Sequence, residues 1–93
     1  MPIQIEKTYT TTNSNTYLTA DAFHAEHGPL GTENLNYILE TGTSELVNNQ
    51  SVKVTCKYAD MAKYNEHAAT TTGGIHAGKG GNVTAGSVTS TDI

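Results

Sequence analysis

The chain has 93 residues, a formal net charge of −4 and no arginine, so its five positive charges are all lysines. Nucleic-acid recognition depends on arginine and on a net positive potential, so we expect no nucleic-acid partner. The length allows one small domain, and 16 residues are Leu, Ile, Val or Phe, which predicts a thin core.

The composition favours a chain that gains order by packing against copies of itself or a partner. Threonine, asparagine and glycine number 16, 8 and 9. The low net charge argues against intrinsic disorder, which combines low hydrophobicity with strong self-repulsion. We predict a small α+β fold, mainly β with one to three short helices, completed by oligomerisation. Residues 1–69 are interpreted as the β-rich domain and residues 70–93 as a Gly/Thr-rich C-terminal arm, with the N-terminal segment also extended.

Residues 2–11 are predicted to form a strand, because alternate residues point to the same face of a strand. The alternating set is Ile3, Ile5, Lys7 and Tyr9. A polar turn follows at 13–15, and we expect residues 16–18 to pair back on Thr8-Tyr9 as a hairpin.

The stretch from Thr19 to Gly28 is the best helix candidate. Thr19 can cap the helix, and Gly28 with the following proline can stop it. Leu18 and Phe23 have the spacing of a hydrophobic staple. Phe23, the only phenylalanine, is therefore predicted to be a core or interface anchor.

In the middle of the chain the sequence pattern fits more than one secondary structure. Residues 32–41 fit either a helix capped by Thr32 or a strand, and we favour the helix. Residues 45–51 indicate a short strand and a turn. Asp60 can cap a helical turn that reaches Ala68, although extended structure fits that stretch as well.

The clearest strand is residues 52–58, in which apolar residues alternate with Lys and Thr. Cys56 lies on the apolar face and is predicted to pack rather than react. After residue 70 the chain cannot form a core alone, and we expect it to lie as a strand-like arm across a neighbouring chain. The predicted core and interface residues are Phe23, Val52, Val54, Cys56, Tyr58, Ile75, Val83, Val88 and Ile93.

No stretch predicts a cofactor or an active site. Gly73 to Gly80 resembles a phosphate-binding loop, but Gly80 stands where that loop needs a hydroxyl for Mg²⁺. The carboxylates are scattered along the chain, and a thin core cannot wall off a cleft, so we expect no enzymatic activity. The opening residues are too polar for a signal peptide, and no stretch is long enough to span a membrane.

The histidines support one alternative. His24 and His27 are three residues apart, on one face of the predicted helix, and could bind a metal with Glu26, His67 or His76. The chain would then be a small metal- or ligand-binding accessory module. The competing interpretation is two surface imidazoles near a helix C-terminus, where they suit the helix dipole.

The Thr/Asn/Gly-rich composition, the alternating strands Ile3 to Tyr9 and Val52 to Tyr58, and the polar tail Gly73 to Ile93 resemble small bacteriophage virion proteins. The resemblance implies a decoration, cement or fibre role in a virion assembled in the host cytoplasm. It also implies binding to copies of itself, as in the trimers common among such proteins, and to other shell subunits. It supplies no site residues.

Overall fold

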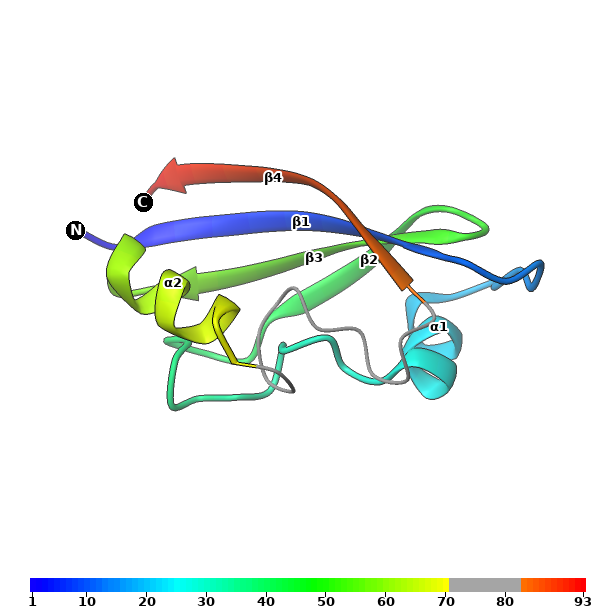
Figure 1. The fold of residues 1–93 in the computed structure, drawn as a ribbon, viewed down its shortest axis with the longest axis horizontal. Helices are drawn as coiled ribbons and strands as arrows, with labels where there is room; N and C mark the ends of the chain where they lie inside the picture. Colours follow the sequence, from blue (N-terminus) through cyan, green and yellow to red (C-terminus); the bar gives the residue numbers. More distant parts are fainter. Residues whose placement is uncertain (71–82) are drawn as a thin grey trace.

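The computed structural model describes residues 1–70 and 83–93 (Figure 1). In these two ranges the chain forms a small α+β fold made mostly of strand, as predicted. The elements are β1 (Ile3–Thr11), α1 (Ala20–His27), β2 (Thr43–Asn48), β3 (Ser51–Tyr58), α2 (Met61–Ala68) and β4 (Val83–Asp92).

The strands pair into one antiparallel sheet with the order β2-β3-β1-β4. The strand β1 is central, with Ile5 opposite Cys56 on β3 and opposite Ser90 on β4. Residues directly opposite each other in a sheet share a face. The alternation in β1 and β3 therefore puts both apolar sets on the same side, as the sequence predicts for each strand separately.

That inner face carries the core. The two helices and the segment between α1 and β2 lie on this side of the sheet (Figure 1). The other face is polar, and there Lys53 contacts Glu6 at 3.6 Å and Glu45 at 2.9 Å. The buried apolar residues among those described are Ile3, Ile5, Tyr9, Tyr17, Phe23, Leu30, Ile38, Val52, Val54, Cys56, Tyr58 and Tyr64.

The helix α1 begins and ends as its sequence predicts. The Thr19 hydroxyl accepts a hydrogen bond from the Ala22 amide, and Gly28 ends the helix with φ 82°, a conformation that favours glycine. The predicted hydrophobic staple between Leu18 and Phe23 does not form, because Leu18 is 95% exposed. The ring of Tyr17 packs on Phe23 instead, with 5.0 Å between ring centroids.

Two other predictions, for residues 16–18 and for residues 32–41, are wrong. Residues 16–18 do not pair with β1, because β3 and β4 occupy both of its edges; the Tyr17 amide donates to the Asn49 carbonyl instead. Residues 32–41 form turns and bends, not a helix or a strand. The backbone there bonds elsewhere, with the Leu39 amide donating to the carbonyl of Lys57.

The remaining local predictions are confirmed. Residues 45–51 contain most of β2 and the turn into β3. The helix α2 is capped by Asp60, whose carboxylate accepts from the Lys63 amide at 2.9 Å. None of the helices in residues 1–70 and 83–93 is both long and apolar enough to cross a membrane.

The prediction of extended arms at both chain ends is corrected by the structure, in which both ends form strands of the same sheet. The N-terminal segment is the central strand β1, and Val83–Asp92 pairs along it as β4. The predicted arm is therefore, over those ten residues, ordered by its own chain rather than by a neighbour. The physical reason is that main-chain hydrogen bonds to a free strand edge need few apolar side chains. The first part of the predicted arm, 71–82, lies outside the described residues.

Candidate interaction surface

The strand β4 forms one edge of the sheet and is nearly uncovered. Of its ten residues Val83 is partly buried and the others are exposed. Figure 1 shows that β4 starts near α1, and that its later part runs along the side of β1 that faces away from the helices. An edge strand presents unpaired N–H and C=O groups that can pair with another chain.

The exposed inner face of β4 includes apolar side chains. Val88 is 45% exposed and shares its face with Lys7, which lies opposite it on β1. Ile93 follows the strand and is also exposed, while its amide donates to the Pro2 carbonyl at 3.1 Å. The strand end is thus fixed in place, and its apolar groups face solvent.

The edge lacks two of the devices that block strand pairing. Natural edge strands are protected by lysine, proline or short length. The sequence of β4 contains neither lysine nor proline, and its one charged residue is Asp92 at the end. A register irregularity lies between Lys7 and Tyr9, which leaves Val88–Asp92 regularly paired. The opposite edge, β2, has six residues and carries Glu45.

Lys7 lies beneath this surface as a buried ammonium group. Its side chain is 2% exposed, and its Nζ is 5.8 Å from the centre of the Tyr9 ring. None of the ion pairs found in the described ranges includes it. Burial lowers its pKa to about 8, because desolvation disfavours the charged form.

The predicted core and interface residues fall into three groups. The core contains Phe23, Val52, Val54, Cys56 and Tyr58. The edge strand and its end contain Val83, Val88 and Ile93, of which Val83 packs against the core. Ile75 lies outside the described residues.

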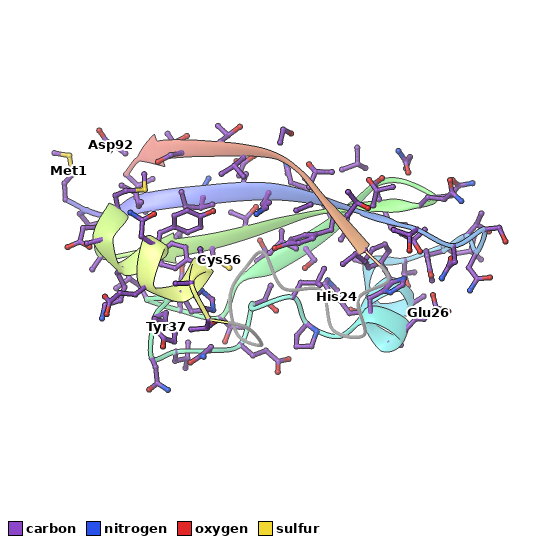
Figure 2. All side chains as sticks on the ribbon, viewed as in Figure 1. Met1, His24, Glu26, Tyr37, Cys56 and Asp92 are labelled. Carbon is purple, nitrogen blue, oxygen red and sulfur yellow. The ribbon has the colours of Figure 1, made fainter. Side chains whose placement is uncertain are left out.

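A polar cluster lies within the core, and the sequence did not indicate it. The Tyr58 hydroxyl lies 2.8 Å from Nδ1 of His67, and the Tyr37 ring stacks on the imidazole at 4.8 Å. Tyr37 comes from the loop between α1 and β2, and Cys56 from the sheet (Figure 2). Burial raises the pKa of the Cys56 thiol to about 12, which suits packing and not nucleophilic chemistry. Nε2 of His67 and the Tyr9 hydroxyl are buried, and neither has a hydrogen-bond partner among the residues that the structure describes.

The two helix histidines have separate environments. His27 is buried, with Nε2 2.9 Å from the Tyr17 hydroxyl and 3.2 Å from Glu26, whose carboxylate also accepts from that hydroxyl. His24 faces the loop and β2, where both of its nitrogens have partners. Among the residues that the structure describes, no three His, Cys, Asp or Glu side chains are close enough to share a metal ion. The candidate ligand His76 and the Gly73–Gly80 loop lie outside those residues.

The burial of His67 predicts a loss of stability in acid. Desolvation lowers its pKa below the ordinary value of 6.5, so the unfolded chain binds the proton more readily. The free energy of unfolding should therefore fall as the pH decreases below about 6.5, by up to ~1.4 kcal/mol per pH unit.

Urea unfolding of the wild type and of His67→Gln between pH 7.5 and 5 measures this contribution. The glutamine variant is expected to be less stable at neutral pH, since the ring contacts are lost, but to have the shallower pH dependence. Parallel pH curves for the two proteins would show that His67 does not titrate on unfolding.

Comparisons with protein-family models, with curated proteins and with solved structures each give no match.

Proposed function

We propose that the protein is a small structural component of a virion, of the decoration, cement or fibre type, that assembles through the free edge of β4. The observation that carries the proposal is the exposure of this ten-residue edge strand, which pairs with the buried central strand β1 on one side only. Strand addition to such an edge supplies main-chain hydrogen bonds, and the regularly paired stretch Val88–Asp92 is the part best placed to make them.

The length of the edge is sufficient for a specific contact. A strand rises about 3.4 Å per residue, so the ten residues span roughly 34 Å, of which the regularly paired Val88–Asp92 is about half. Pairing along it also places side chains of the second chain beside Val88, whose cross-strand neighbour on β1 is the buried Lys7. The apolar burial is small for each contact, and a shell sums such contacts over many copies.

The first partner that this edge fits is a second copy of the same chain, paired antiparallel. The single charge of β4, Asp92, stands at one end of the strand. Antiparallel pairing of two β4 strands puts the two carboxylates at opposite ends, whereas parallel pairing places them side by side. Such a contact joins two four-stranded sheets into one continuous sheet around a two-fold axis.

The virion assignment is supported by the resemblance in composition and by the thin core. With 16 Leu, Ile, Val and Phe residues in the chain, little apolar area is available for folding alone, and contacts between subunits add to it. A surface that pairs through backbone groups can also accept strands of other shell subunits.

Sedimentation from nanomolar to high micromolar concentration tests the self-association. We expect a monomer–dimer equilibrium in which Val88→Lys weakens association at least tenfold (~1.4 kcal/mol), since two lysines then meet near the centre of the edge. The matched control is Val47→Lys on β2, which is 58% exposed on the other edge and should leave association unchanged.

Two results would contradict this part of the proposal. One is a wild-type monomer at all concentrations, and the other is an equal effect of Val88→Lys and Val47→Lys. Hydrogen exchange locates the contact independently, because association should slow amide exchange in β4 and not in β2.

The virion assignment has a test of its own. Particles purified from cells that produce the protein are separated on a density gradient and analysed by quantitative mass spectrometry. The proposal predicts that the protein co-sediments in fixed, multiple copies per particle, and that Val88→Lys lowers its copy number. Recovery of the whole protein at the top of the gradient would contradict it.

A further inference from the structure

A second feature lies where α1 meets the start of β2. It is a cavity of about 240 Å³ in which side chains from the helix, the following loop and β2 meet. The residues that line it are Asp21, His24, Pro29, Thr32, Glu33, Thr41, Gly42 and Ser44. The label for His24 in Figure 2 marks its place at the end of the molecule that holds α1.

The lining residues Ser44 and His24 form a chain of hydrogen bonds with the carbonyl of Gly28. Nε2 of His24 lies 2.7 Å from the Ser44 hydroxyl, and Nδ1 lies 2.6 Å from the carbonyl oxygen of Gly28. A carbonyl oxygen can only accept, so in the neutral ring Nδ1 carries the hydrogen. Nε2 is then the acceptor, and the Ser44 O–H donates to it.

The local backbone explains why the imidazole is held in this orientation. Gly28 ends α1 with φ 82°, and its amide donates to the His24 carbonyl at 2.7 Å while its own carbonyl accepts from the ring. The ring also meets Phe23 edge-on, with centroids 6.0 Å apart. Both its nitrogens and one edge are therefore fixed before any ligand arrives, and Ser44 and His24 are each only partly buried.

We propose that Ser44 is an activated serine that accepts acyl groups from small esters, with His24 as its general base. A nucleophile bonded to a base that is itself oriented by a third group is the arrangement that activates serine in covalent catalysis. This activity is separate from assembly through β4, since it uses α1 and β2.

The reaction needs only Ser44, His24, the ester and water. The Ser44 oxygen attacks the ester carbonyl carbon while its proton passes to Nε2 of His24. The bond between the carbonyl carbon and the alcohol oxygen then breaks, and the proton leaves with the alcohol. Water hydrolyses the resulting serine ester by the reverse roles, which releases the carboxylic acid and restores the Ser44 hydroxyl.

The cavity restricts the class of ester. Its volume admits a short acyl group, and the acidic residues Asp21 and Glu33 are among those that line it. Like charges repel at close range, so the site favours uncharged or cationic esters over anionic ones. We therefore expect acetyl esters to react and esters of dicarboxylic acids with a free carboxylate to react more slowly.

The test is covalent labelling of the full chain with p-nitrophenyl acetate, followed by peptide mapping. Treatment with hydroxylamine separates serine esters from the stable amides formed on lysines. We expect the acetyl ester on Ser44, at a rate at least ~100-fold above that of His24→Gln, because a positioned base contributes about that factor or more. Glutamine keeps a hydrogen-bonding group at this position but cannot take the proton.

The controls separate activation from simple exposure. Ser90 is exposed on β4, and no histidine of the described residues is hydrogen-bonded to it. Ser90→Ala should therefore leave labelling unchanged, whereas Ser44→Ala should abolish the ester. Within wild-type protein the map compares Ser44 with Ser90 and Ser14 directly, which needs no variant to fold. Equal labelling of the three serines, or equal rates for wild type and His24→Gln, would overturn the proposal.

Discussion

Replacement of Phe23 by alanine is expected to lower the free energy of unfolding by ~3–5 kcal/mol, since the ring is fully buried. Its centroid lies 5.0 Å from that of Tyr17 and 4.6 Å from that of His27, so the substitution removes the centre of an aromatic cluster. Small domains have a total stability of about 5–15 kcal/mol, and the variant should therefore be close to unfolded at physiological temperature.

Urea or guanidinium titration of both proteins measures the difference through the midpoint, at an unchanged slope. The matched control is Leu18→Ala, five residues earlier on the same segment. Leu18 is exposed, so its loss should change stability by less than about 0.5 kcal/mol. A large effect of Leu18→Ala would show that the staple forms after all, and a small effect of Phe23→Ala would contradict the buried cluster.

The second large effect is a gain in stability. We expect Lys7→Met to raise the free energy of unfolding at pH 7 by ~2–3 kcal/mol. The substitution replaces a buried ammonium group, which has no ion-pair partner among the described residues, by an apolar side chain of similar length. The lysine stem already packs in the interior, so methionine keeps most of those contacts.

The same group predicts how stability depends on pH. The pKa of Lys7 is lowered from 10.5 in the unfolded chain to about 8 in the fold. Between these values the unfolded state binds the proton and the folded state does not, so stability rises with pH from about 8 upward. Above pH 9 the buried Cys56 opposes the rise, since its raised pKa makes the folded state retain a proton that the unfolded state loses.

The difference in the free energy of unfolding between the wild type and Lys7→Met isolates the contribution of the lysine, because Cys56 is present in both proteins. This difference should be largest below pH 8 and should shrink toward pH 10. The matched control is Lys53→Met on the polar face, where the ammonium contacts Glu6 and Glu45 near solvent. That substitution should be neutral or slightly destabilising. A destabilising Lys7→Met would mean that an anionic group partners Lys7 in solution.

The expected effects of Phe23→Ala and Lys7→Met on stability both arise from the shape of the core. The sheet offers more inner face than the two helices cover, so α1 anchors one end through Phe23 and β4 stays open on its own side (Figure 1). Lys7 lies at the border between the two regions, with Val54 and Val88 as its cross-strand neighbours. A partner over β4 therefore changes the surroundings of Lys7 as well as the edge.

The strands and helix caps could be predicted from the sequence because they are local. Alternation from Ile3 to Tyr9 and from Val52 to Tyr58 depends on strand geometry alone. The caps at Thr19 and Asp60 depend on a side-chain oxygen and an amide two or three residues apart. These elements form as predicted, and the small α+β class follows from them.

The partners of each segment depended on tertiary structure. Whether Leu18 or Tyr17 covers Phe23, and whether 32–41 is helical, is decided by which neighbouring surface is free. The same holds for Val83–Asp92. A Thr/Ser-rich strand has no apolar pattern that would indicate whether it pairs with its own chain or with a neighbouring chain. His24 and Ser44 are 20 residues apart and meet only because α1 packs beside β2.

The sequence by itself thus determined the pattern of each element, since that pattern arises from contacts within a few residues. The tertiary structure alone decided that β1 is central, that the C-terminal strand completes its own sheet, and that Lys7 is buried. These outcomes depend on competition among strand edges and surfaces distant in the chain, for which local propensity carries no information.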